Sequence, residues 1–205
     1  MARLAIALVA LAVIMGCGGS SPAANPGHRS AQRIAVQNAE VTALTLCSQS
    51  GKPDTVIKAM RDGNDSRDAK ELQTSWDIAT SNGALEGYYV GYAASAADCS
   101  DYLFGPMPVE QLHGGWLLNY IVVFSKAKEA QAAWKSGLFL PSPDELQASG
   151  ATVGTSTGLG DYAVVGTTDN PWLAIWSTGS TYSVLLTSLG PASGLQLAQE
   201  VTRRM

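Results

Sequence analysis

The chain has 205 residues, 13 of them basic and 17 acidic, which gives a formal net charge of −4. This length suits one domain with a sizeable core, or at most two small ones, and we expect one. Nucleic-acid binding depends mainly on basic side chains that contact phosphates, so an acidic chain without a basic stripe indicates no nucleic-acid partner.

Residues 1–16 have the three-part pattern of an export signal. Arg3 lies in a short start, residues 4–15 form an unbroken apolar run, and Gly16 stands directly before Cys17. The run would span about 18 Å as a helix, whereas crossing a membrane requires about 20 residues. We therefore expect a cleaved signal peptide rather than a permanent span.

The junction Ile14-Met15-Gly16-Cys17 resembles the lipobox of bacterial lipoproteins, although Met15 stands where a small residue is usual. The resemblance implies cleavage before Cys17 and attachment of lipid, palmitate included, to its sulfur. Acyl chains contribute about 0.8 kcal/mol per buried methylene, which would hold the protein at a bacterial membrane, outside the cytosol. The alternative is an ordinary secretory signal followed by a chance cysteine.

Residues 17–30, which would begin the mature chain, are rich in Gly, Ser, Pro and Asn. Such a composition cannot bury an apolar face, so we expect a lipidated, flexible tether in which His28 is solvated. The folded domain is then expected to cover residues 31–205.

Two cysteines remain once Cys17 is assigned to lipid. In an oxidising compartment, a disulfide between Cys47 and Cys99 is the simplest expectation. The alternative is two separate buried thiols.

Helical patterns dominate the first part of the domain. Apolar residues recur at helical intervals over residues 31–48, which predicts a helix with Cys47 near its end. Pro53 is placed to open a second helix over 53–62, and a third is expected over 68–80.

The later part alternates strands and helices. A strand is expected over 87–92, and residues 117–124 are apolar on both faces, as in a central strand covered on both sides. Helices should follow over 127–137 and 143–150, the second beginning with the Ser, Pro and Glu of a capping box.

Three further strands are expected over 162–167, 172–177 and 182–188, joined by short turns that favour an antiparallel meander. A closing helix should follow Pro191. This order predicts an α+β fold in which an antiparallel sheet of about four to five strands packs against helices.

Two short motifs lie in the second half of the chain. Residues 122–130 have the pattern V-x-F-S-x-A-x-x-A, and residues 158–163 have G-x-G-D-x-A. Together they resemble motifs of small bacterial lipoprotein and secreted domains of unassigned function. The resemblance implies a type of fold rather than an activity.

The catalytic motifs in the chain are incomplete. Ser156 lies in a G-x-S-x-G pattern, but the histidine of an α/β-hydrolase follows its serine, and no histidine follows His113. Residues 125–128 match S-x-x-K without the S-D-N and K-T-G of penicillin-binding enzymes. Two distant histidines do not form a zinc site. We expect a non-enzymatic protein with no cofactor and no metal.

Aromatic residues are the most informative candidates for binding. Trp172 and Trp176 are four residues apart on an expected strand, so both point to one face. They either pack in the core or line an apolar pocket or surface patch. The further candidates for such a ligand or partner surface are Trp116, Tyr88, Tyr89 and Tyr92.

Two functional hypotheses follow from these patterns. The leading one is a membrane-anchored, extracytoplasmic lipoprotein that binds an envelope protein or a cell-envelope component. The second is a carrier of an apolar small molecule or lipid, held in a pocket between the helices and the sheet.

Overall fold

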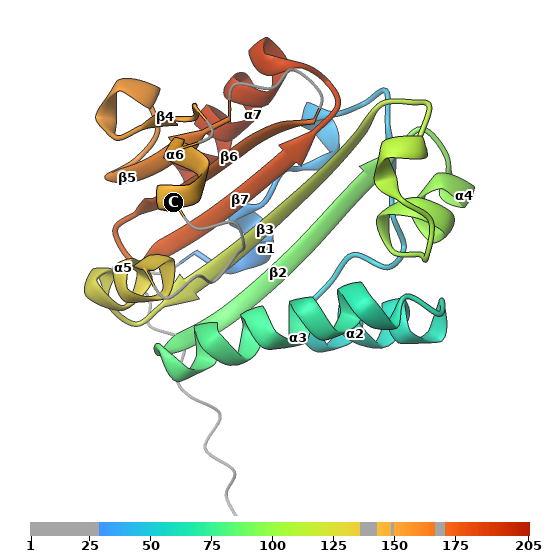
Figure 1. Cartoon of the computed structure of the whole chain (residues 1–205), viewed down its shortest axis with the longest axis horizontal. Coiled ribbons are helices and arrows are strands. Elements are labelled where there is room, and N and C mark those ends of the chain that lie inside the picture. Colours follow the sequence, from blue (N-terminus) through green and yellow to red (C-terminus); the bar gives the residue numbers. More distant parts are fainter. Residues whose placement is uncertain (1–28, 136–142, 149, 167–170) are drawn as a thin grey trace, which may run out of the picture.

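The computed structural model describes residues 29–135, 143–148, 150–166 and 171–205 (Figure 1). The expected signal peptide, the lipobox with Cys17 and most of the tether lie outside these residues. Ser30 is already part of the fold, since its carbonyl oxygen accepts hydrogen bonds from Arg33 and Ile34 at the start of the first helix.

One antiparallel sheet organises the described chain. The strands are β1 (Thr45–Leu46), β2 (Ala84–Ala93), β3 (Trp116–Phe124), β4 (Thr152–Val153), β5 (Tyr162–Val165), β6 (Trp172–Thr178) and β7 (Thr181–Thr187). Their order in the sheet is β1-β2-β3-β7-β6-β5-β4. Strands β3 and β7 therefore pair in the middle of the sheet although they are far apart in the sequence.

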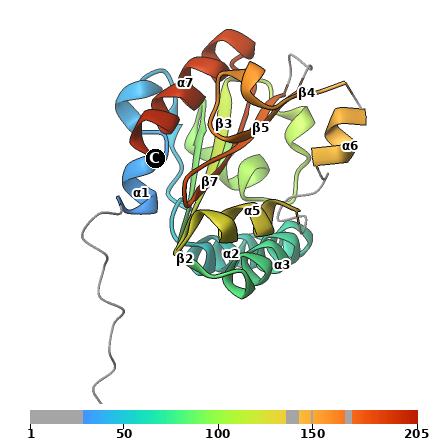
Figure 2. The same cartoon turned by 90° about the vertical axis from the view of Figure 1, so that its left-hand side faces the viewer.

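Helices cover both faces of the sheet. The α-helices are α1 (Ala31–Ile34), α2 (Pro53–Asp62), α3 (Ser66–Ser81), α4 (Ala96–Asp98), α5 (Ala127–Lys135), α6 (Pro143–Ala148) and α7 (Pro191–Arg204). Shorter turns are the 3-10 helices η1 (Asn38–Glu40), η3 (Val109–Gln111) and η4 (Thr155–Thr157), and the π-helix η2 (Cys99–Leu103). Seen nearly along the sheet edge, α1 and α7 lie on one side, whereas α2, α3 and α6 lie on the other (Figure 2).

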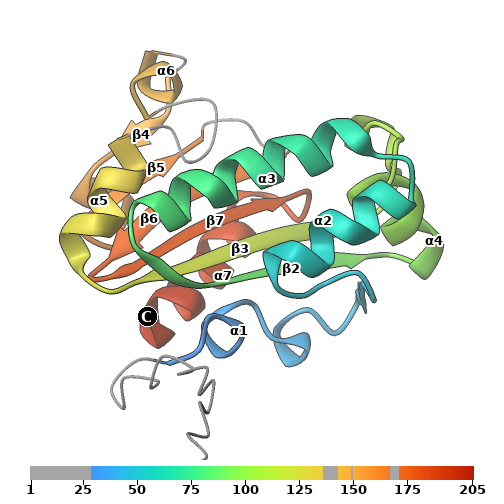
Figure 3. The ribbon, with the colours of Figure 1, turned by 90° about the horizontal axis from the view of Figure 1, so that it is seen from below.

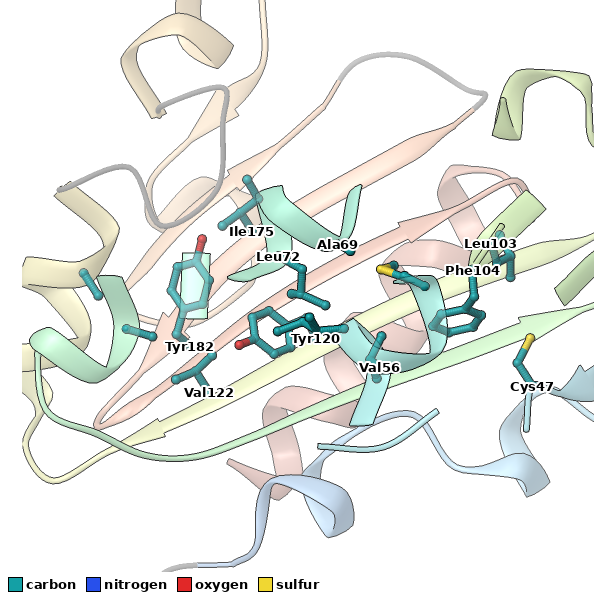
Figure 4. Packing of buried hydrophobic residues seen from close by; sticks show 14 of the residues in the cluster. Cys47, Val56, Ala69, Leu72, Leu103, Phe104, Tyr120, Val122, Ile175 and Tyr182 are labelled. Atoms are coloured by element: carbon teal, nitrogen blue, oxygen red, sulfur yellow. The ribbon is translucent and has the colours of Figure 1, made fainter. Parts of the chain in front are cut away.

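Alternation along the strands builds a separate hydrophobic cluster on each face. On β3, Tyr120 and Val122 point toward α2 and α3, which lie over this face of the sheet (Figure 3), whereas Leu117 and Ile121 point toward α1 and α7. We call these the α2/α3 face and the α1/α7 face. Figure 4 shows the packing on the α2/α3 face, where Leu72 of α3 lies over Tyr120.

The predicted α+β class is confirmed, but the sheet has seven strands instead of four to five. The two extra strands, β1 and β4, contain two residues each and form the two edges. A two-residue strand is too short for an alternating pattern to be visible in the sequence. Such short edges also offer little backbone for pairing with another sheet.

The predicted helix over residues 31–48 is wrong, because α1 ends at Ile34. The following backbone is extended and bonded to side chains of the sheet: Val36 N donates to Asn119 Oδ1 (3.0 Å), and Val36 O accepts from the Tyr92 hydroxyl (3.0 Å). The 3-10 turn η1 then follows, held by reciprocal bonds between Gln37 and Glu40. The spacing of apolar residues here comes from successive turns rather than from one helix.

The other expected helices agree with the structure. Helix α2 begins at Pro53, and α3 begins after Asp65, whose carboxylate accepts a hydrogen bond from Asp68 N (3.2 Å) as an N-cap. Helices α5 and α6 begin at the expected residues. The predicted end of α5 at residue 137 and the residue predicted to cap α6, Ser142, lie outside the described residues.

Substitution of Asn119 tests whether its hydrogen bond to Val36 holds the N-terminal segment on the sheet. Asn119 is fully buried, and its amide also donates to Ser183 Oγ (3.1 Å) and Val184 O (2.7 Å). Asn119→Ala leaves Val36 N–H buried without an acceptor, so we expect the free energy of unfolding to fall by about 3 kcal/mol in urea titrations. Ser183→Ala leaves the Val36 bond intact and should cost about 1 kcal/mol. Equal losses in the two variants would contradict this assignment.

Candidate binding groove

Trp172 and Trp176 are not open to solvent. They point to the same face, as predicted, and their exposed fractions are 2% and 0%. Trp172 packs directly on α7, where a Cβ atom on Gly194 would lie 2.2 Å from its Cε3 atom. Of the two alternatives that the sequence left open, the structure thus shows packing in the core of the α1/α7 face rather than a surface patch.

The remaining aromatic candidates are divided between the two faces. Trp116 is buried on the α2/α3 face, whereas Tyr92 is buried on the α1/α7 face. Tyr88 is partly buried on the α1/α7 face, and burial raises its pKa. Tyr89 points the other way, against the rings of Phe104 and Tyr120 (centroids 5.9 and 5.5 Å). Neighbours in a strand alternate between faces, so these residues do not form one surface.

A groove lies on the α1/α7 face, lined by residues of α7 and of the segment that follows α1. Its volume is about 450 Å³. One wall is the segment 39–44, and the other is the first part of α7. The groove is lined by Ala39, Glu40, Val41, Thr42, Ala43, Leu44, Leu189, Ser193, Gln196, Leu197 and Glu200.

The segment 39–44 is fastened at both ends. At one end, the Arg204 guanidinium donates to both carboxylate oxygens of Glu40, and also to Ile34 O (3.0 Å) and Ala35 O (3.1 Å). At the other end, the predicted disulfide Cys47–Cys99 is confirmed, with both cysteines buried. The groove wall is therefore held in place by an ion pair and a covalent bond.

The groove has an apolar floor and a polar rim. Val41 and Leu197 are buried in the floor, with Leu44 and Leu189 partly buried beside them. On the rim, the side chains of Thr42, Ser193 and Gln196 make no hydrogen bond to any described residue. The two rim carboxylates are occupied, because Glu40 pairs with Arg204 and Glu200 pairs with Arg203.

The described residues that line the groove are apolar, hydroxyl-bearing, amide or carboxylate side chains. Ser193 is the one serine among them, and this described lining contains no histidine or cysteine. The serine of the G-x-S-x-G pattern, Ser156, lies in the 3-10 turn η4 rather than in a strand-to-helix turn, and Ser125 donates its hydroxyl proton to the Glu129 carboxylate. Among the described residues, no group of three or more His, Cys, Asp or Glu could hold a metal ion.

The sequence contains no signal for this groove. Its walls are about 150 residues apart in the chain and meet only because α1 and α7 pack on the same face. The apolar spacing of residues 31–48 predicts a helix, and this helical pattern conceals the turn that forms one wall.

Comparison with protein families finds no matching family, and neither curated proteins nor solved structures show a match to this chain. Within the described part of the chain, the helices are all too short or too polar to cross a membrane.

Buried tyrosines predict how stability depends on pH. Burial raises the pKa of Tyr92 from 10.0 to about 12, and it also raises the pKa of Tyr89, Tyr120 and Tyr182. Above pH 10.0 the tyrosines of the unfolded chain lose their phenolic protons, whereas these tyrosines keep them in the folded protein. For Tyr92 the folded protein keeps the proton until about pH 12. The free energy of unfolding should therefore be unaffected by these groups below pH 10 and fall above it.

Alkaline titration with tyrosinate absorbance and circular dichroism recorded together checks this expectation. The buried Tyr92, Tyr120 and Tyr182 and the partly buried Tyr89 should ionise only as the circular dichroism of the fold is lost. Ionisation of all tyrosines near their ordinary pKa in a protein with unchanged circular dichroism would contradict it.

Proposed function

We propose that this protein is a lipid-anchored, extracytoplasmic, non-enzymatic lipoprotein that binds an envelope protein or a cell-envelope component in the groove between residues 39–44 and α7. The observation that carries the binding part is the groove itself, whose largely buried apolar residues are flanked by hydrogen-bonding side chains. An apolar centre within a polar rim is the usual composition of a protein interface.

Two observations support export and anchoring. The Ile14–Cys17 junction resembles a lipobox, apart from Met15. A buried disulfide is typical of proteins that fold in oxidising compartments, and Cys47–Cys99 is such a bond.

The groove lies on the face where the described chain begins. Arg29 Nη1 donates to Arg204 O (3.3 Å), which places the start of the domain beside the C-terminal end of α7. The stretch from Cys17 to Arg29 could span about 40 Å at most if fully extended. A lipid on Cys17 would thus keep the groove close to the membrane surface, where an envelope partner would be met.

A second candidate function, the carrier of an apolar ligand, is favoured by one observation on the opposite face. Leu118, Leu186 and Leu173 pair across β3, β7 and β6 in the centre of the sheet, yet all three are only partly buried. Central strands usually bury such side chains completely, so this row of leucines is a place where an apolar molecule could pack.

Lipid attachment is tested by the change Cys17→Ser, which removes the thiol that would carry the acyl chains. The wild-type protein should enter the detergent phase in phase partitioning of cell extracts, and the variant should enter the aqueous phase. The domain lies outside the altered site, so circular dichroism should be the same for both. A variant that still partitions into detergent would exclude the proposed anchor.

Partner binding is tested with a photoreactive amino acid at Gln196, on the groove rim, and at Gln199 as the matched control. Both residues are exposed on α7, but only Gln196 lines the groove. Irradiation of intact cells should give a cross-linked species at position 196 and none at 199, measured by immunoblot and identified by mass spectrometry.

The same samples distinguish the two functions. If neither position cross-links, and native mass spectrometry of the extracted protein shows a bound small molecule beyond the anchor, the carrier function replaces groove binding. Equal cross-linking at both positions would show that the groove is not the site of contact.

A further inference from the structure

Trp176 donates its indole proton to the last residue of the chain. Its side chain is fully buried in β6, and the indole nitrogen Nε1 lies 3.2 Å from Met205 Sδ. An indole N–H is a donor only, and a buried donor without an acceptor is costly. Because Trp176 has no exposed surface, the thioether takes the place that water would occupy at an exposed indole.

Met205 differs from the other described methionines in its surroundings. Met60 is buried in the core of the α2/α3 face, and Met107 is 42% exposed. Met205 is partly buried at the end of the chain, packed against the α1/α7 cluster, with its sulfur in contact with the indole. Met205 is therefore a partly exposed residue whose sulfur makes a specific contact with a buried ring.

We propose that Met205 is an oxidation site whose sulfoxide changes the contact with Trp176 and loosens the C-terminal clamp on the N-terminal segment. The oxidant is a peroxide. A sulfur lone pair attacks one peroxide oxygen, the O–O bond breaks and an S–O bond forms. The sulfur loses two electrons, and the peroxide is reduced to water. The indole proton is not transferred in this step.

The effect on the clamp follows from the position of the sulfur. At 3.2 Å from Nε1, there is no room for an oxygen atom between the sulfur and the indole, so the sulfoxide can accept the indole proton only if the sulfur moves away. The neighbouring residue is Arg204, whose guanidinium holds Ile34 O, Ala35 O and Glu40. A displaced chain end therefore disturbs the bonds that hold residues 31–40, including one end of the groove wall.

The test treats purified full-length protein with hydrogen peroxide and follows each methionine by peptide mapping. We expect Met205, like Met107, to be oxidised before the buried Met60, because oxidation follows exposure. The assigned ¹⁵N–¹H indole signal of Trp176 should shift as Met205 is converted. Amide hydrogen exchange of residues 31–40 should become faster in the oxidised protein.

Two matched variants separate this effect from general damage. In Met205→Leu, peroxide should leave the Trp176 signal and the exchange of residues 31–40 unchanged. In Met107→Leu, both changes should occur as in the wild-type protein. Cys47 and Cys99 are bonded to each other and have no free thiol, so they do not compete with the methionines for peroxide.

Two results would overturn the proposal. One is a Met205 that stays reduced after Met107 is fully converted. The other is a Met205 that is fully oxidised to the sulfoxide while the Trp176 indole signal and the hydrogen exchange of residues 31–40 stay unchanged. Both results can be obtained with the wild-type protein. Neither depends on whether the groove has a ligand.

Discussion

The structure depends on how the backbone N–H and C=O groups of the segment after α1 find hydrogen-bond partners where this segment crosses the α1/α7 face of the sheet. An extended segment on a sheet face has no neighbouring strand to bond with, so each buried N–H and C=O group needs another partner. Val36 obtains both partners from side chains, Asn119 on β3 and Tyr92 on β2. Arg204 supplies donors for the two preceding carbonyl groups. These bonds join the start of the domain, the centre of the sheet and the end of the chain.

The same face shows why small and polar residues lie beside the largest ones. Trp172 is opposite Thr187 in the β6–β7 pair, and Trp176 is opposite Ser183. The short side chains of Thr187 and Ser183 leave volume for the indole rings. Both hydroxyl groups have hydrogen-bond partners: Thr187 donates to Trp116 O, and Ser183 accepts from Asn119. Polar residues can be buried at no large cost when they are bonded in this way. The tryptophans are thus a consequence of packing, and the open groove lies beside them, where α7 meets the segment 39–44.

Much of the fold was predictable, because it depends on patterns that extend over many residues. The five longer strands, the helices that begin at Pro53 and Ala127, and the disulfide were all recovered. The failures have two causes. The strands β1 and β4 and the turn η1 are two or three residues long, so no period can be read from them. Residues 31–48 had helical spacing, but side chains from β2 and β3 hold the backbone in another conformation.

By itself, the sequence determined the class of fold, the cysteine pair and the expectation of an exported, lipid-bearing chain, because each of these follows from local composition or short-range spacing. Only the tertiary structure decided that the tryptophans are core residues and that a groove exists. Both outcomes depend on which faces meet when α1 and α7 pack on one side of the sheet. Such contacts join residues about 150 positions apart, and no local pattern encodes them.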